Sequence, residues 1–254
     1  MFTTYADTLT YLYQNLPVFK RVGSAAYKKD LANTIRLCEI LDNPQKKFKS
    51  VHIAGTNGKG STSHMLAAVL QVEGYKTGLY TSPHLHEFTE RIRVDGAEIS
   101  REFVIDFVNR IHPYIDEIRP SFFEITVAMA FDYFASERID IAVIEVGLGG
   151  RLDSTNVITP ELSLITNIGM DHKDLLGDTL VQIAGEKAGI ITPGVPVVIS
   201  GGQPEIDSVF IRRAQELDSP IYFASGDFRV EPVHKAGRIT LNVFHGGDLI
   251  FPEL

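Results

Sequence analysis

A glycine-rich loop with one lysine is the part of this sequence best suited to bind a charged ligand. Segment 51–62 reads Val-His-Ile-Ala-Gly-Thr-Asn-Gly-Lys-Gly-Ser-Thr. Its glycines allow backbone N–H groups to curl around phosphate oxygens, and Lys59 adds a full positive charge. These residue types therefore indicate the binding of a nucleoside triphosphate. The residues expected to contact the nucleotide are Gly55, Thr56, Asn57, Gly58, Lys59, Gly60 and Ser61.

The loop differs from the common Walker form, in which a serine or threonine follows the lysine and binds magnesium. Counting from Lys59 places Ile53 where the first glycine should be, and Gly60 where that hydroxyl should be. A magnesium ion would therefore need a hydroxyl from elsewhere. Ser82 is a candidate because it follows the next predicted strand, although a serine before proline is also typical of a turn without chemistry.

Two more polar residues come at the ends of predicted strands. Glu145 ends the apolar run 139–145, and His172 follows the strand predicted over 162–168. A buried carboxylate is costly without a partner, and this end of a strand is where nucleotidase folds hold magnesium. Glu145 and His172 could thus converge on one metal ion. The alternatives are a buried salt bridge for the glutamate and a structural role for the histidine.

The elements that position these residues alternate between short apolar strands and helical patterns. This order predicts an α/β fold with a P-loop-containing, mainly parallel sheet flanked by helices, in which the carboxyl ends of the strands share one edge. From Asp227 onward the pattern changes to short strands with a Gly246-Gly247 turn, which predicts a small antiparallel β subdomain near the C-terminal end. Strands are predicted at 51–54, 75–80, 139–145, 162–168, 195–199 and 221–224, and helices at 5–16, 31–41, 100–117, 121–135, 179–191 and 204–217.

Three features have both a structural and a functional interpretation. Ser121 and Glu124 have the spacing of a capping box at the start of a helix. Lys187 lies in an otherwise apolar helix, where it either reaches water or points into the site. The loop 17–27, which contains Lys20, either lies over a ligand or, as we expect, is a solvated connection.

Composition limits the possible classes of protein. The chain has 254 residues, 44% of them apolar, and a net charge of −8 without a long basic run, which argues against a nucleic-acid partner. It has no apolar run that could span a membrane and no signal peptide, so we expect a cytoplasmic protein without a membrane partner. Cys38 is the only cysteine, which excludes an intrachain disulfide, and we expect it to be buried.

Six segments, in family order over nearly the whole chain, resemble the folylpolyglutamate synthases and dihydrofolate synthases, a branch of the Mur-type ATP-dependent amide ligases. The phosphate loop alone would fit several Mur-type ligases, whereas the Ser-Pro-His loop and the Phe-Phe-Glu segment point to the folate branch. The segments are 55–61, 80–85, 121–124, 145–156, 171–172 and 186–190.

The resemblance implies roles for individual residues, with ATP and Mg²⁺ as cofactors. Lys59 and Lys187 would be catalytic, and Lys187 would be carbamylated, which turns a cation into a carboxylate-like ligand near the metal. The implied magnesium ligands are Ser82, Glu145 and His172. The residues implied at the pterin pocket are Ser121, Phe122, Phe123, Glu124 and Asp153.

The implied reaction joins L-glutamate to dihydropteroate or to a folate carboxylate through an acyl phosphate. Residues 1–226 would form the central ATPase domain of a Mur-type ligase, and residues 227–254 would begin a small β segment of the same domain. Family members continue into a C-terminal glutamate-ligase domain, which is absent here, so we expect this chain to be inactive alone. We expect small-molecule partners only (dihydropteroate or folate, L-glutamate and ATP) and a monomer. The alternatives are another Mur-type ligase acting on a cell-wall precursor, and a nucleotide-binding domain without ligase activity.

Overall fold

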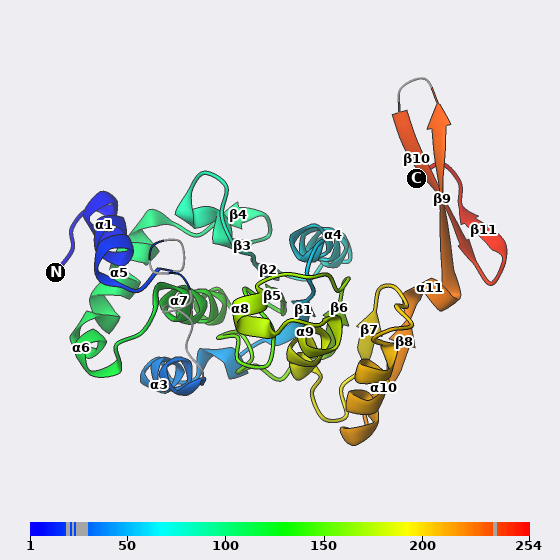
Figure 1. Ribbon diagram of the computed structural model, residues 1–254. Coiled ribbons are helices and arrows are strands. Elements are labelled where there is room, and N and C mark those ends of the chain that lie inside the picture. The colour runs from blue at the N-terminus through cyan, green and yellow to red at the C-terminus, as the bar shows by residue number, and fades with distance from the viewer. Residues whose placement is uncertain (19–20, 22, 24–29, 236–237) are drawn as a thin grey trace.

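An eight-stranded sheet forms the centre of the computed structural model, which describes residues 1–18, 21, 23, 30–235 and 238–254 (Figure 1). The strand order is β4-β3-β2-β5-β1-β6-β7-β8. All neighbours from β2 to β8 pair in parallel, and β3 and β4 add an antiparallel hairpin at one edge. The strands are β1 (Lys49–Ala54), β2 (Thr77–Tyr80), β3 (Ile92–Val94), β4 (Ala97–Glu98), β5 (Ile141–Glu145), β6 (Leu162–Ile165), β7 (Val197–Ile199) and β8 (Ile221–Phe223).

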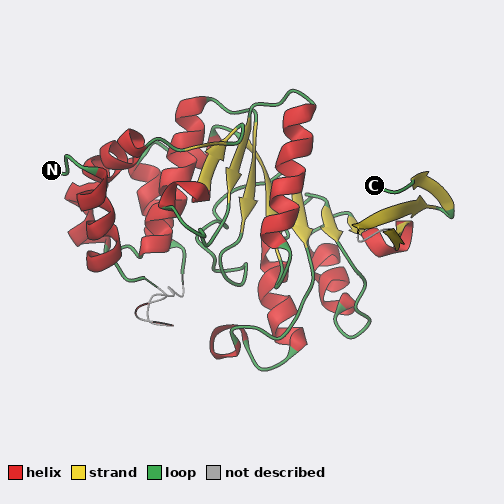
Figure 2. Cartoon of the chain, turned by 90° about the horizontal axis from the view of Figure 1, so that it is seen from above, coloured by secondary structure: helices red, strands yellow, loops and turns green. Residues whose placement is uncertain are grey.

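Helices cover both faces of this sheet, as the view from above shows (Figure 2). The α-helices among the described residues are α1 (Tyr5–Asn15), α3 (Ala32–Ile40), α4 (Lys59–Val72), α5 (Arg101–Ile111), α6 (Ile115–Ile118), α7 (Phe122–Glu137), α8 (Lys173–Leu176), α9 (Leu180–Lys187), α10 (Asp207–Glu216) and α11 (Ala224–Asp227). Short 3-10 turns are η2 (Pro44–Lys46), η3 (Phe88–Arg91), η4 (His112–Tyr114) and η5 (Ala188–Ile190).

The central strands are buried on both faces because their side chains alternate between two helical layers. Val143 of β5 and Leu79 of β2 pack with Ala67 of α4 on one face. Ile144 and Tyr80, the next residues in each strand, face the larger core that contains α1, α5 and α7. A continuous apolar run in a strand is the expected sequence pattern for this arrangement.

The structure confirms the predicted fold class and corrects several element boundaries. The helix predicted over 100–117 ends at Ile111, and η4 and α6 follow, because Pro113 has no N–H to continue the helical hydrogen bonds. The strand predicted over 162–168 ends at Ile165, and the backbone beyond it forms part of the site. Cys38 is buried, as predicted. Lys20, in the predicted loop 17–27, lies outside the described residues.

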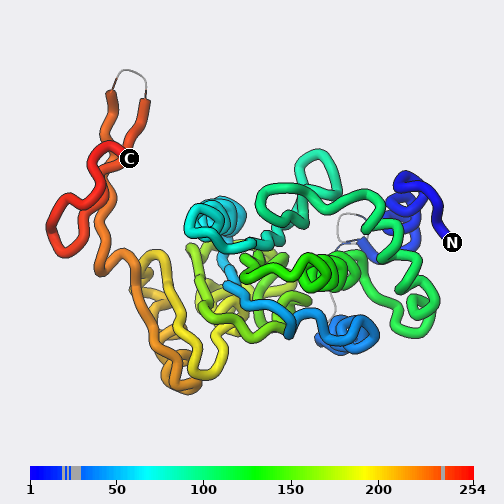
Figure 3. The backbone as a smooth tube through the Cα atoms, turned by 180° about the vertical axis from the view of Figure 1, so that it is seen from behind, coloured from blue at the N-terminus to red at the C-terminus, as the bar shows by residue number. Residues whose placement is uncertain are grey.

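A separate three-stranded antiparallel sheet at the end of the chain projects away from the main body (Figures 1 and 3). Its strands are β9 (Phe228–Lys235), β10 (Arg238–His245) and β11 (Asp248–Phe251), in the order β11-β10-β9. This sheet matches the small antiparallel β subdomain that the sequence predicts. In the part of the chain that the structure describes, every helix is too short or too polar to cross a lipid bilayer.

Candidate nucleotide and substrate site

The glycine-rich loop joins β1 to α4 and has a backbone that glycine alone adopts easily. Gly58 is the N-cap of α4 with φ +82°, and it has no side chain to cap the helix. The first N–H groups of a helix have no partner within the helix, so those of α4 can donate to an anion. Gly55 has φ +146°, and a Cβ built on it would lie 1.7 Å from Thr166 Oγ1.

The loop is fixed to the backbone that follows β6. Thr56 N–H donates to Asn167 O at 2.7 Å, and Asn57 N–H donates to the Asn167 side chain at 2.8 Å. In return, the Thr166 hydroxyl donates to Asn57 O at 2.8 Å. These contacts hold the loop in one conformation before any ligand binds, which lowers the entropic cost of binding.

Two lysines from distant parts of the chain share one acceptor in this loop. Lys59 Nζ donates to Gly55 O at 3.1 Å, and Lys187 Nζ donates to the same oxygen at 2.7 Å. Burial, followed by repulsion from Lys59, lowers the pKa of Lys187 from 10.5 to about 8. The sequence left open whether Lys187 reaches water or points into the site. Its side chain is buried and bonds the phosphate loop, so it points into the site.

Glu145 lies between the phosphate loop and the loop that follows β2. Its side chain is 4% exposed, and its Oε2 accepts the backbone N–H of Ser82 at 2.9 Å. On the side of the phosphate loop, a Cβ built on Gly60 would be only 3.7 Å from Glu145 Oε1. Burial raises the pKa of Glu145, and the Ser82 N–H and the Lys59 charge oppose that rise. No described residue forms an ion pair with this carboxylate within 4.0 Å, so it is available to a cation.

The residues expected to bind magnesium lie at this edge of the sheet, but they are not a preformed cage. His172 is the N-cap of α8 with φ +44° and lines the same cavity as Ser82. The described residues include no group of three or more His, Cys, Asp or Glu side chains that could hold a metal ion. Glu145 and Ser82 supply oxygen ligands, and such a small number suits Mg²⁺, which is usually held by one or two carboxylates together with phosphates and water.

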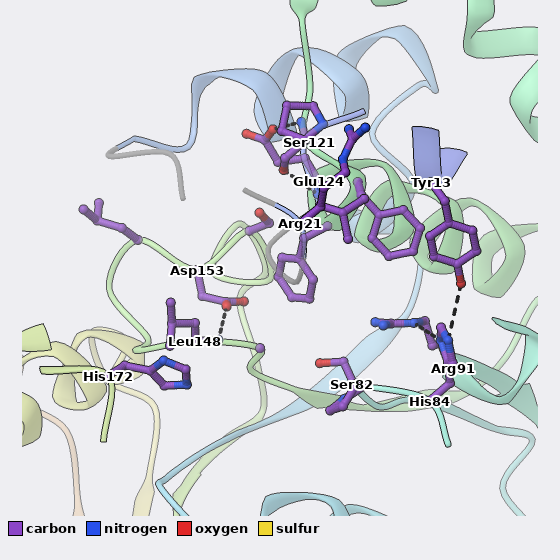
Figure 4. A pocket seen from close by; sticks show the side chains of 18 residues that line it. Tyr13, Arg21, Ser82, His84, Arg91, Ser121, Glu124, Leu148, Asp153 and His172 are labelled. Carbon is purple, nitrogen blue, oxygen red and sulfur yellow. Dashed lines mark hydrogen bonds between the residues drawn. The ribbon is translucent and has the colours of Figure 1, made fainter. Parts of the chain in front are cut away.

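A cavity of about 560 Å³ opens beside these residues (Figure 4). Tyr13 and Phe122 stack in its wall with ring centroids 5.1 Å apart. Phe123 lies so close to Gly147 that a Cβ built on Gly147 would be 2.3 Å from the Phe123 ring. The residues implied by the resemblance that line the cavity are Ser82, Ser121, Phe122, Phe123, Glu124, Asp153 and His172.

One side of the cavity carries a buried positive charge. The Arg91 guanidinium lies 5.4 Å from the centre of the Phe122 ring, and its Nε donates to His84 Nδ1 at 2.8 Å. Tyr13 OH lies 3.3 Å from His84 Nε2 (Figure 4). The cavity thus combines flat aromatic surfaces with a cation, which suits an aromatic ligand that carries an acidic group.

Ser121 and Glu124 form the predicted capping box at the start of α7. Ser121 N–H donates to the Glu124 carboxylate at 2.6 Å, and Glu124 N–H donates to Ser121 Oγ at 3.2 Å. Their polar atoms therefore stabilise the helix end that carries Phe122 and Phe123 into the cavity. Both residues also line the cavity, so a ligand contact is compatible with the capping role.

Several residues of the cavity have no role that the sequence alone indicates. Tyr13 and Arg91 come from α1 and η3, far from the phosphate loop in sequence, and no local pattern indicates that their side chains converge. His84 belongs to the Ser-Pro-His loop that carries the resemblance, which is the one signal that could have identified it. Arg21, on the loop expected to be a solvated connection, also lines the cavity.

Comparisons with known proteins agree with this geometry. Residues 53–225 match the family model described as the Mur ligase middle domain. The chain is 41% identical over 227 residues to the dihydrofolate synthase/folylpolyglutamate synthase of Bacillus subtilis, covering 87% of this chain and 51% of that protein. The chain therefore spans about half the length of this curated relative.

Solved structures of folylpolyglutamate synthases have the same fold. The enzyme from Thermotoga maritima superposes with a TM-score of 0.83 and is 38% identical, covering 95% of this chain and 55% of that one. A complex of FPGS with AMPPCP and folate gives a TM-score of 0.87 at 33% identity, covering 96% of this chain and 60% of that one. The chain therefore belongs to the Mur ligase family through its middle domain, and over the shared region its sequence and fold are similar to those of folylpolyglutamate synthases.

Proposed function

We propose that this chain is the ATP-binding and pterin-binding part of a ligase that joins L-glutamate to dihydropteroate or to a folate carboxylate. Residues 1–226 are the proposed ATPase domain, and residues 227–254 are the start of a small β segment of that domain. The glutamate-binding half of the site is proposed to lie in the part of the relatives that has no counterpart here. A cytoplasmic location and a monomeric state remain predictions from the sequence.

The observation that carries the proposal is the position of Ser82 between two sites. Its backbone N–H is bound by Glu145, whose carboxylate faces Gly60 of the phosphate loop. Ser82 also lines the aromatic cavity. A γ-phosphate at the N-terminus of α4 and a carboxylate at the mouth of the cavity would thus be neighbours. The related complex of FPGS with AMPPCP and folate contains one ligand of each kind, which supports this arrangement.

The residues present would support acyl activation chiefly by positioning and by charge. The loop N–H groups and Lys59 would hold the triphosphate, and the stacked rings of Tyr13 and Phe122 would orient the substrate so that its carboxylate meets the γ-phosphate. Phosphate transfer then gives an acyl phosphate, from which the amine of glutamate displaces phosphate to form an amide. Arg91 would neutralise an acidic group of the substrate within the cavity.

Ser82, Glu145 and His172 are the residues that would hold magnesium. When bound, Mg²⁺ neutralises charge on the transferring phosphoryl group. The neutral amine of Lys187 is proposed to attack CO₂, forming the N–C bond of a carbamate and releasing one proton from the nitrogen. Its buried position and its pKa of about 8 support this step, because a larger fraction of the amine is neutral near pH 7 than for an ordinary lysine.

Isothermal titration of the chain with Mg-AMPPCP and, separately, with dihydropteroate tests the proposed function. We expect each ligand to bind with a stoichiometry of one, and we expect no phosphate release from ATP when glutamate is added. Binding of Mg-AMPPCP without binding of dihydropteroate or folate would contradict the folate assignment and would favour a Mur-type ligase with another substrate.

A further inference from the structure

A chain of three buried side chains connects the strand before the phosphate loop to the aromatic cavity. His52 of β1 is 0% exposed, and its Nε2 lies 2.9 Å from Thr155 Oγ1. The Thr155 hydroxyl lies 2.5 Å from Asp153 Oδ1. Asp153 is 3% exposed and lines the cavity, whereas His52 and Thr155 lie behind it. The residues implied by the resemblance include Asp153 but neither of the other two.

The hydrogen bonds to Asp153 favour its ionised form. Its Oδ1 accepts the Thr155 hydroxyl and the Thr155 N–H at 3.0 Å, and its Oδ2 accepts the Leu148 N–H at 2.8 Å (Figure 4). Burial raises the pKa of the carboxyl, and these three donors, together with the Gly147 N–H, oppose the rise. A carboxylate has about four acceptor positions. The Thr155 hydroxyl and N–H fill those of Oδ1, whereas Oδ2 accepts the Leu148 N–H, with the Gly147 N–H nearby.

The order of the protons in the chain follows from this arrangement. Thr155 has one hydroxyl proton, and an ionised Asp153 can only accept a hydrogen bond, so the hydroxyl donates to it. The Thr155 oxygen must then accept a hydrogen bond from His52 Nε2–H. Burial lowers the pKa of His52 to about 3, so the ring is neutral and carries that single N–H. Its Nδ1 has no hydrogen-bond partner among the described residues, which agrees with an unprotonated nitrogen at that position.

We propose that His52 and Thr155 are positioning residues that hold Asp153 as a fixed acceptor for an N–H group of an aromatic heterocycle bound in the cavity. This inference rests on the proposed function, because a pteridine ring is flat and carries N–H donors at its edge. His52 donates to Thr155, Thr155 donates to Oδ1, and Oδ2 is the oxygen that accepts from the ligand. Neither positioning residue touches the ligand itself.

A pair of substitutions at one position separates positioning from packing. Thr155→Val removes the hydroxyl at nearly constant volume, whereas Thr155→Ser keeps it. Thr34→Val is the matched control, because Thr34 is also fully buried and its hydroxyl has no partner among the described residues. Each variant is titrated with dihydropteroate and with Mg-AMPPCP, after its thermal unfolding has been compared with that of the wild-type chain.

We expect Thr155→Val to raise the Kd of dihydropteroate about tenfold or more, which corresponds to about 1.4 kcal/mol. The Kd of Mg-AMPPCP should stay within about twofold, since the phosphate loop keeps its own contacts. Thr155→Ser should restore most of the pteridine affinity, and Thr34→Val should leave it unchanged. Wild-type affinity in Thr155→Val would overturn the positioning role but leave the proposed function intact. If the wild-type chain itself bound Mg-AMPPCP but no pteridine, both the positioning role and the proposed function would be overturned.

The ¹⁵N NMR spectrum of His52 gives a second test that needs no ligand. The inference requires the neutral tautomer with its proton on Nε2, unchanged between about pH 5 and pH 8 because the ring titrates near pH 3. Thr155→Val should shift the Nε2 signal, whereas Thr155→Ser should leave it close to that of the wild-type chain. A proton on Nδ1 in the wild-type chain would mean that Asp153 is the donor in this chain of hydrogen bonds, and it would overturn the inference.

Discussion

Substitution of Gly55 by alanine should damage the phosphate loop far more than the same change at Gly58. A Cβ on Gly55 would lie 1.7 Å from Thr166 Oγ1, and the backbone there has φ +146°. The hydroxyl cannot move freely, because it donates to Asn57 O at 2.8 Å and lies 3.3 Å from Ala54 O. Steric overlap and backbone strain together should lower the free energy of unfolding by roughly 2 to 6 kcal/mol.

Gly58→Ala provides the matched control for this prediction. Its backbone is also left-handed, with φ +82°, but a Cβ there would meet no atom within 4 Å. It should therefore cost only about 1–2 kcal/mol, from backbone strain alone. Urea unfolding followed by circular dichroism gives both free energies, and titration with Mg-AMPPCP reports on the loop itself.

Removal of the clashing hydroxyl should make the Gly55 substitution less harmful. In the double variant Gly55→Ala/Thr166→Ala, the nearest remaining atom of residue 166 would be Cβ, at 3.0 Å from the new methyl group. We therefore expect the double variant to be more stable than the sum of the single effects predicts, by about 1 kcal/mol or more. Strict additivity, or equal stability of Gly55→Ala and Gly58→Ala, would refute the steric reasoning.

Three other substitutions test separate parts of the site. Glu145→Gln should raise the Kd of Mg-AMPPCP about tenfold or more but leave magnesium-free AMPPCP binding unchanged, as titration with and without Mg²⁺ will show; equal effects under both conditions would argue against a metal ligand. Gly147→Ala should weaken dihydropteroate binding by a similar factor without affecting Mg-AMPPCP, because its Cβ would lie 2.3 Å from the Phe123 ring. In CO₂-free buffer, where Lys187 stays a free amine, the unfolded chain keeps the Lys187 proton between about pH 8 and 10.5 and the folded chain has lost it. Wild-type stability should therefore gain up to about 3 kcal/mol there relative to Lys187→Met. Parallel urea-derived stability profiles of those two proteins would contradict the buried position of the amine.

The phosphate loop could be predicted from the sequence because its signals are local. The order of strand, glycine-rich loop and helix is contained within residues 49–72, and its chemistry follows from residue types alone. The capping box of Ser121 and Glu124 is equally local, and the structure has it as predicted. Glu145 could be assigned to a strand end because its carboxylate follows directly after a buried apolar run.

The aromatic cavity could not be predicted in the same way, because its walls come from distant segments. Tyr13 stacks on Phe122 across more than a hundred positions of sequence, and Arg91 reaches the same ring from η3. Such contacts depend on how α1 and the β3–β4 hairpin pack against α7, which local periodicity does not encode. The resemblance to a family supplied Phe122 and Phe123 as pocket residues, but not the partners that hold them.

The interactions of buried polar residues were also beyond the reach of the sequence. His52 precedes the phosphate loop by three positions and is followed by apolar residues, so its pattern indicates only a strand residue. Its partner Thr155 lies on the loop after β5, and their contact requires the register of two parallel strands. Strand register is set by tertiary packing, which explains why this contact is visible only in the structure.

A crystal structure of this chain with Mg-AMPPCP and dihydropteroate would test most directly whether one chain holds both ligands in reacting positions. We expect the phosphates at the N-terminus of α4, the pteridine ring in the cavity against Phe122 and Phe123, and an N–H of that ring on Asp153. The substrate carboxylate should then point toward Ser82 and the γ-phosphate. A pteridine bound outside this cavity, or one whose carboxylate points away from the phosphate loop, would contradict the proposed function.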